Sequence, residues 1–145
     1  MNRFPFQVDG TDAGGTAARA TTLKLPHGEV QTPVFMPVGT QGAIRGLAAP
    51  LLHDTPATII LANTYHLSQR PGEKIVKKHG GIHKLMGTHL PVLTDSGGVQ
   101  VFRLKKSSVT EEGVTFAYEV DGKKTFLSAE RSMEIQEALG ADIAM

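Results

Sequence analysis

Residues 91–98, PVLTDSGG, join a short apolar stretch to a polar loop that contains two glycines. The apolar part, Pro91 to Thr94, has the length and composition of a buried strand. In parallel α/β folds the loops after the strands hold the ligand, and glycines let backbone N–H groups approach it closely. The candidate site residues are therefore Asp95, Ser96, Gly97 and Gly98. The same residues would also make an ordinary turn, because Asp and Ser bond their own backbone.

Further strands of this kind are predicted on both sides of the first. They cover residues 34–38, 57–62 and 142–145. Helical patterns separate them: 48–53, a helix from Pro71-Gly72 to Gly80-Gly81, an apolar stripe at Ile82, Leu85 and Met86, and a helix capped by Ser128 with the apolar face Ile135, Ala138 and Leu139 and a stop at Gly140. Strands that alternate with helices predict an α/β fold with a parallel sheet, either doubly wound or in a barrel.

Two antiparallel units accompany these elements. An opening β-hairpin is predicted over residues 20–31, and a small antiparallel insertion over 102–126, after the third strand. A (β/α)₈ barrel usually needs about 250 residues, so four strands with their helices are about half of one. The pattern alone leaves a half-barrel and a small open sheet as alternatives. In either case residues 1–145 form one continuous piece.

Composition excludes several classes of protein. Lys and Arg number 15 against 14 Asp and Glu, so the net charge of +1 gives no argument for a polyanionic partner. The absence of cysteine excludes a disulfide framework and a cysteine zinc site. The start of the chain lacks the apolar core of a signal peptide, and no apolar run is long enough for a bilayer. An intracellular protein without an integral membrane segment is expected.

Polar residues also follow two other predicted strands. Asn63-Thr64-Tyr65-His66 comes after residues 57–62, where the Tyr-His pair is more often packed than catalytic. The loop 39–46, with Thr40, Gln41 and Arg45, follows the first strand without either common nucleotide-binding motif. No metal site is predicted, because the other histidines lack ligand spacing and are expected at the surface or as caps: His27, His53, His79, His83 and His89.

Five segments occur along the chain in a fixed order: TPVFMPVGTQGAIRGL (32–47), ILANTYHLSQRPG (60–72), LTDSGGVQVFRL (93–104), VTEEGVTF (109–116) and IQEALGADIAM (135–145). Together they resemble the tRNA-guanine transglycosylase (queuine tRNA-ribosyltransferase) family, from about residue 20 onward. They look most like the queuine-using enzymes of eukaryotes.

The resemblance implies the N-terminal half of a (β/α)₈ barrel and a glycosyltransferase that acts in queuosine modification of tRNA. In this family a nucleophilic aspartate attacks the ribose of the wobble guanosine, guanine leaves, and queuine or a related 7-deazaguanine replaces it. By similarity Asp95 is the proton acceptor and acid/base that also contacts the base, while Ser96, Gly97 and Gly98 line the pocket. Asn63 is expected to contact the ribose or to support Asp95.

The chain departs from the family at one position and in extent. Val99 stands where the family has Phe or Tyr to stack on the base, a contact worth about 1 to 3 kcal/mol. The family's nucleophile, RNA-contacting residues and Zn²⁺ site of three Cys and a His match nothing up to Met145. The chain alone is therefore expected to be inactive and to hold no cofactor.

Three hypotheses about the chain follow. The first is the N-terminal portion of a transglycosylase, which acts on the tRNA anticodon loop as a dimer, with itself or with a paralogous subunit. The second is a non-catalytic partner subunit of a full-length transglycosylase. The third is a free-standing binder of 7-deazaguanine bases. A cytoplasmic protein is expected, with association with mitochondria as an alternative.

Overall fold

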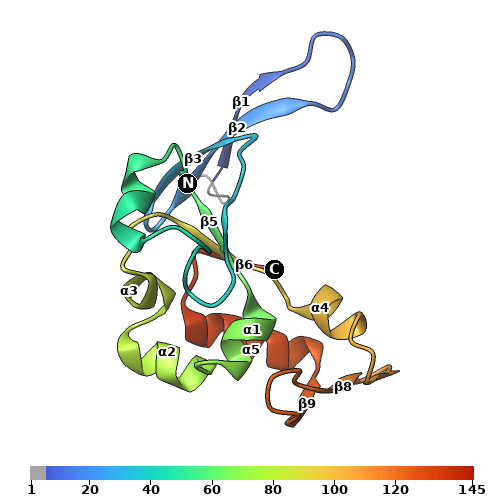
Figure 1. Cartoon of the computed structure of the whole chain (residues 1–145). Coiled ribbons are helices and arrows are strands. Elements are labelled where there is room, and N and C mark those ends of the chain that lie inside the picture. Colours follow the sequence, from blue (N-terminus) through green and yellow to red (C-terminus); the bar gives the residue numbers. More distant parts are fainter. Residues whose placement is uncertain (1–5) are drawn as a thin grey trace.

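A parallel sheet of four short strands organises the computed structural model, which describes residues 6–145 (Figure 1). The strands lie in the order β10-β6-β5-β4, the reverse of their order in the chain. Their bounds are Val38–Gly39 (β4), Ile60–Ala62 (β5), Val92–Thr94 (β6) and Ile143–Ala144 (β10). All three pairings are parallel, which confirms the predicted α/β class. Residues 1–5, on which the search for a signal peptide mainly rests, lie outside the described part.

The strands are shorter than predicted, and the sheet is open. In the segment 34–38 only Val38 joins a strand, because Pro33 precedes the segment, Pro37 lies within it, and neither has an N–H to donate to a ladder. Within residues 6–145, β4 and β10 are the edge strands, so this part of the chain makes no closed barrel.

Helices connect these strands as expected, with two additions. The predicted segments appear as the 3₁₀ helix η1 (Ala49–Asp54) and the α-helices α2 (Glu73–His79), α3 (Ile82–Met86) and α5 (Ala129–Leu139). The end signals of α5 are confirmed: Ser128 Oγ accepts the N–H of Arg131 at 3.1 Å, and Gly140 ends the helix with φ of 69°. The helices α1 (Thr64–Gln69) and α4 (Gly98–Phe102) were not predicted.

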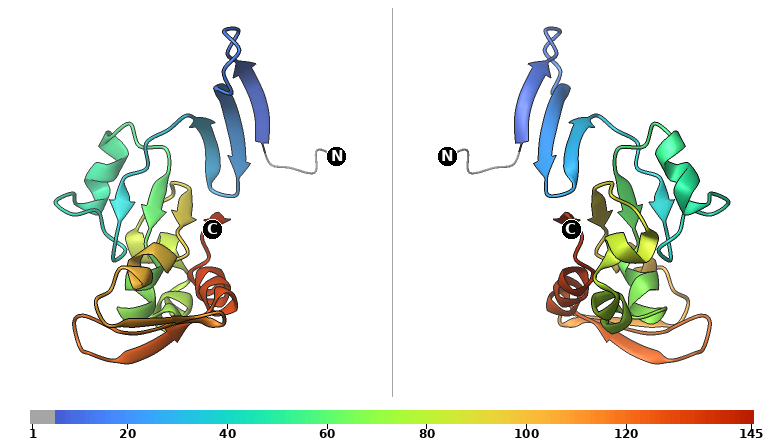
Figure 2. Two further views of the ribbon diagram at one scale, coloured as in Figure 1. Left: turned by 90° about the vertical axis from the view of Figure 1, so that its right-hand side faces the viewer. Right: turned by 90° about the vertical axis from the view of Figure 1, so that its left-hand side faces the viewer.

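Two antiparallel sheets lie at opposite ends of the molecule (Figure 2). At one end β2 (Arg19–Leu25) and β3 (Gly28–Thr32) pair around residues 26–27, and β1 (Phe6–Thr11), which was not predicted, adds a third strand. At the other end β7 (Ser107–Thr110), β8 (Gly113–Ala117) and β9 (Lys124–Leu127) form the insertion. The predicted insertion began too early, because residue 102 ends α4.

The core lies between the parallel sheet and the helices. Ile60, Ala62 and Val92 of the sheet are fully buried, as are Val76 of α2 and Leu139 of α5. These residues belong to one apolar cluster. The strand ends are thereby fixed against the helices that follow them, which positions the polar loops described below.

An ion pair ties α2 to α5 beside this core. Arg131 donates to the buried carboxylate of Glu73, and also to exposed Glu134 at 3.2 Å. Burial tends to raise the pKa of Glu73, but the hydrogen bond and charge of Arg131, the residue's own backbone N–H and the charge of Lys74 together outweigh burial and hold the pKa below its ordinary value of 4.5. The charged form is therefore the one that stabilises the fold.

Glu73→Gln is expected to lower the free energy of unfolding by about 1.5 to 3 kcal/mol at neutral pH, because it removes a charge-assisted hydrogen bond. A carboxylate whose folded pKa is lowered stabilises the protein above the unfolded pKa, and this is lost as the pH falls through the folded pKa. In urea titrations the difference in the free energy of unfolding between wild type and variant should be constant near neutral pH and should become smaller below pH 4.5. Glu134→Gln is the exposed control, and an equal loss in both variants would contradict the assignment.

Candidate functional site

The carboxylate of Asp95 lies at the carboxyl end of β6 and accepts four hydrogen bonds. Oδ1 accepts the backbone N–H groups of Thr64 and Gly97, at 2.9 and 3.1 Å. Oδ2 accepts the side-chain amides of Asn63 and Gln100, at 2.9 and 3.0 Å. The carboxylate is thus fixed by donors from the ends of β5 and β6 and the starts of α1 and α4.

Asn63 has two partners, one for each end of its side-chain amide. Its Nδ2 donates to Asp95, and its Oδ1 accepts the N–H of His66 at 3.1 Å, which caps α1. The residue is buried, with 6% of its surface exposed. The structure therefore brings together Asn63 and Asp95, the two polar side chains predicted at neighbouring strand ends.

Sequence reasoning missed Gln100 as a partner of Asp95. A signal was present, because Gly98 and the apolar Val99, Val101 and Phe102 after it fit one turn of helix, and a helix there places Gln100 over the preceding loop. The predicted antiparallel insertion, which started at residue 102, obscured that turn.

Gly97 gives the loop its shape. Its φ is +75°, in the left-handed region, and a Cβ placed on it would lie 3.1 Å from the backbone N and 3.2 Å from the Cβ of Tyr65. Glycine therefore allows both the turn and the close approach of β6's loop to α1. This approach lets the carboxylate of Asp95 reach the N–H of Thr64.

Gly97→Ala is expected to destabilise the chain by about 1 to 3 kcal/mol more than Gly46→Ala, because the new methyl group presses on the backbone of Tyr65. Gly46 is a matched control, since its φ is +77° and a Cβ there meets nothing within 4 Å. The two variants share the cost of a left-handed alanine, so thermal or urea unfolding isolates the contact. Equal stabilities would show that the approach to α1 is unimportant.

The other predicted pocket residues lie beside Asp95 in the chain and border a neighbouring cavity or solvent. Ser96 and Gly98 help to line a cavity of about 630 Å³ with residues of the β7–β8 turn and the start of α5, and Asp95 is not among its lining residues. The carbonyl of Ser96 accepts the hydroxyl of Ser132 at 2.7 Å. Val99 is 63% exposed on α4. The loop is thus in place, but these residues do not share one cavity with Asp95.

Two other groups of polar residues were predicted after strands, in the loop 39–46 and at Tyr65-His66. Thr40, Gln41 and Arg45 line a separate hollow of about 490 Å³. Tyr65 is buried, with its ring 4.7 Å from that of His66 and 5.5 Å from that of Phe116. The Tyr-His pair was expected to be packed and hydrogen-bonded. The packing is confirmed, but His66 Nδ1 is buried without a hydrogen-bond partner among residues 6–145.

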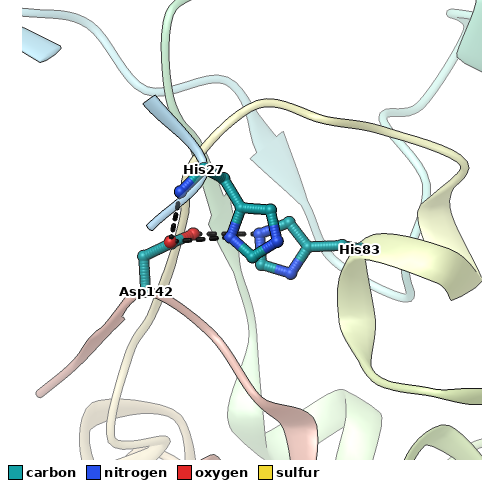
Figure 3. Close-up of side chains that lie close together, drawn as sticks. All are labelled: His27, His83 and Asp142. Atoms are coloured by element: carbon teal, nitrogen blue, oxygen red, sulfur yellow. Dashed lines mark hydrogen bonds and ion pairs between the residues drawn. The ribbon is translucent and has the colours of Figure 1, made fainter. Parts of the chain in front are cut away.

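A second polar cluster lies at the amino ends of the strands (Figure 3). The side chain of Asp142, just before β10, accepts His27 Nδ1 at 2.8 Å, His83 Nε2 at 2.9 Å and the N–H of Val92 at 2.9 Å. The rings of His27 and His83 stack with centroids 3.5 Å apart. The prediction of a surface position is confirmed for His27, which is exposed, and is wrong for His83, which is only 8% exposed. The contact of both rings with a carboxylate distant in sequence was not predicted.

Burial and hydrogen bonding set the ionisation of this cluster. Burial tends to raise the pKa of Asp142, but the N–H of Val92 and the two histidines hold it below its ordinary value. Burial lowers the pKa of His83, and the neighbouring His27 lowers it further. The cluster therefore favours an ionised Asp142 beside a neutral His83.

The chain offers no thiolate for a metal, because it contains no cysteine. Its residues therefore do not fit the site of three Cys and a His that the resemblance implies for the complete family. Among residues 6–145, no helix is both long and apolar enough to span a membrane.

Comparison of the sequence with known proteins identifies the family of the chain. The family model described as Queuine tRNA-ribosyltransferase matches residues 12–145. A protein of that name from Thermotoga neapolitana is 56% identical over 140 residues, 97% of this chain and 37% of the relative. A relative of the same name from Psychrobacter sp. is 49% identical over 141 residues, which cover 97% of this chain and 37% of the relative. Another from Xylella fastidiosa is 50% identical over 146 residues, which cover 100% of this chain and 37% of the relative.

The chain spans 37% of the length of these three relatives. All three come from bacteria, so they do not support the expectation of a eukaryotic type of sequence. The match includes both the loop of Asp95 and the cluster around Asp142. By this match the chain belongs to the queuine tRNA-ribosyltransferase family.

Proposed function

We propose that this chain supplies the base-binding part of a tRNA-guanine transglycosylase, with Asp95 as the acid/base group. The observation that supports it is the four N–H donors that hold the carboxylate at the carboxyl end of β6. In α/β folds of this kind ligands bind at that edge of the sheet. Family membership supplies the reaction, and the geometry supports the residue.

The chemistry that the resemblance implies needs a proton at two stages. A nucleophilic carboxylate forms a bond to C1′ as the bond from C1′ to guanine N9 breaks, and the leaving base gains a proton. The entering base then loses a proton as its own nitrogen bonds to C1′ and the carboxylate leaves. Asp95 gives and takes this proton in the proposal.

Asp95 needs a free lone pair for that role, and its present partners suggest how one is exposed. The two donors to Oδ1 are backbone groups and cannot leave without moving the chain. The two donors to Oδ2 are side-chain amides, which can rotate. In the proposal Oδ2 therefore faces the base, while Oδ1 stays anchored.

The rest of the proposal concerns the complete protein. The four parallel strands are proposed to be half of a (β/α)₈ barrel. The nucleophile and the Zn²⁺ site are proposed to lie in the part of the complete family enzyme that residues 1–145 do not match. Ser96, Gly97, Gly98 and Val99 are proposed to border the base, and Asn63 to support Asp95. The substrates are tRNA and queuine or a related base, and the enzyme is proposed to work as a dimer in the cytoplasm.

A chimera tests this proposal. Residues 1–145 replace the matching part of the Thermotoga neapolitana relative, and incorporation of labelled guanine into tRNA is measured. We expect exchange by the chimera, none by the 145-residue chain alone, a loss of at least about 100-fold with Asp95→Asn, and no loss with the exposed Asp54→Asn. A folded but inactive chimera, with the 145-residue chain co-purifying with the complete relative, would favour the non-catalytic partner instead.

Val99→Tyr in the same chimera tests the proposed contact between Val99 and the base. A stacked aromatic ring contributes about 1 to 3 kcal/mol, so KM for the base should fall by about 5- to 150-fold. Phe102→Tyr, on the same helix and 69% exposed in the wild type, is the control. An unchanged KM in Val99→Tyr would place residue 99 away from the base.

A further inference from the structure

We infer that His27, His83 and Asp142 form a binding site for one divalent transition-metal ion of the zinc type. The site lies at the amino ends of the parallel strands, away from Asp95 at their carboxyl ends. It differs from a cysteine zinc site in its donors and in its place in the chain. The inference does not depend on the proposed function.

The three donors come from separate elements and converge. His27 lies in the β2–β3 turn, His83 in α3, and Asp142 before β10 (Figure 3). Their ligand atoms all lie within 4.8 Å of one another. His27 Nδ1 and His83 Nε2 each face one oxygen of the carboxylate, at 2.8 and 2.9 Å. One ion could therefore contact all three residues after a local rearrangement of the side chains.

The rearrangement changes both the ligand distances and the ring orientations, because the two rings stack only 13° from parallel and at least one must turn for both lone pairs to point at one ion. Zinc bonds of about 2.1 Å in a tetrahedral site place neighbouring ligand atoms about 3.3 to 3.4 Å apart. The distance from each of these two histidine nitrogens to its carboxylate oxygen must therefore increase by about half an ångström. His27 belongs to an exposed turn of two residues between β2 and β3, so this side of the cluster can move.

The donor set selects the kind of ion. Two imidazoles and a carboxylate suit zinc and its transition-metal neighbours, whereas Mg²⁺ and Ca²⁺ prefer oxygen ligands. The N–H of Val92 already orients the carboxylate at 2.9 Å, as partners of metal ligands do. When the ion binds, each imidazole gives up to solvent the proton on the nitrogen that faces Asp142 and takes one up on its other ring nitrogen, so it stays neutral. The metal replaces the two N–H···O bonds, and water fills the fourth position.

Exposure allows an ion to enter. The side chain of Asp142 has no exposed surface and that of His83 is 10% exposed, but the side chain of His27 is 39% exposed. An ion would arrive from solvent beside His27 and meet the two buried ligands. It would then tie the β2–β3 turn to α3 and to the parallel sheet.

Titration of the untagged 145-residue chain with Zn²⁺ and with Co²⁺ tests the site. The chain has no cysteine, so stoichiometric binding reports on histidine and carboxylate donors. We expect one ion per chain, a rise in Tm on binding, and no effect of Mg²⁺. His27→Ala should weaken binding at least about tenfold. The control His53→Ala removes another exposed histidine, and it should bind like the wild type.

An NMR spectrum of the imidazole nitrogens of the wild type gives a second readout, which does not depend on a variant that folds. Of the six histidines, zinc should shift the ring signals of His27 and His83 and leave the other four in place, at His53, His66, His79 and His89. Equal affinities of His27→Ala and His53→Ala, or no binding of one ion to the wild type, would overturn the inference. The cluster would then be a hydrogen-bonded clamp only.

Discussion

Asp95→Ala is expected to lower the free energy of unfolding by about 2 to 4 kcal/mol, because it leaves several donors without an acceptor. Two of the four are side-chain amides, which can find water if the loop opens. The other two are the backbone N–H groups of Thr64 and Gly97, and both residues are buried. Unfolding in urea, followed by far-ultraviolet circular dichroism since the chain has no tryptophan, measures the loss.

Asp95→Asn and Asp54→Ala separate the causes of that loss. Asparagine keeps an oxygen for Thr64 and Gly97 but turns its own amide toward Asn63 and Gln100. Asp95→Asn should therefore lower the free energy of unfolding by less than half as much as Asp95→Ala. Asp54 is exposed, so its replacement should change stability by under about 0.5 kcal/mol. If Asp95→Ala is as stable as the wild type, the four hydrogen bonds do not fix the loop.

Leu139→Ala is expected to cost about 2 to 5 kcal/mol, the range for removing a large apolar side chain from a packed core. Leu139 has no exposed surface and belongs to the central cluster, where α5 packs beside α2. Its removal leaves a cavity between this helix and the sheet that flexible neighbours fill only in part. The denaturation midpoint should fall while the dependence on urea concentration stays unchanged.

Met133→Ala is the matched control, because Met133 lies on the same helix and is 50% exposed. Alanine favours helix slightly, so this variant should stay within about 0.5 kcal/mol of the wild type. Similar losses in the two variants would mean that α5 does not pack through the face predicted from Ile135, Ala138 and Leu139.

Local signals explain what could be predicted from the sequence. Ser128 and Gly140 bound α5 because a cap and a left-handed glycine act on residues within one turn. The strand before Asp95 is short, apolar and followed by polar residues, so both the strand and the loop could be located. Asn63 could be placed near Asp95 because both follow parallel strands.

Long-range contacts explain what could not be predicted. Nothing in the sequence near His83 indicates that the carboxylate of Asp142, 59 positions away, accepts a hydrogen bond from its ring. In β1 the alternation of apolar and polar residues covers only residues 6–9, which is too short to predict a strand, and every residue of the strand is exposed. Asn63 alone does not predict helix α1, because an asparagine after a strand serves equally well as a helix cap or as a polar residue of a site.

The double role of Asn63 links the site to the stability of a helix. If a ligand on Asp95 takes the place of the Asn63 amide, the side chain that also caps α1 loses one of its two anchors. The first turn of α1 should then open more often, and the amide hydrogen of His66 should exchange faster with solvent. Hydrogen exchange at this one amide would therefore report occupancy at Asp95 without any catalytic turnover.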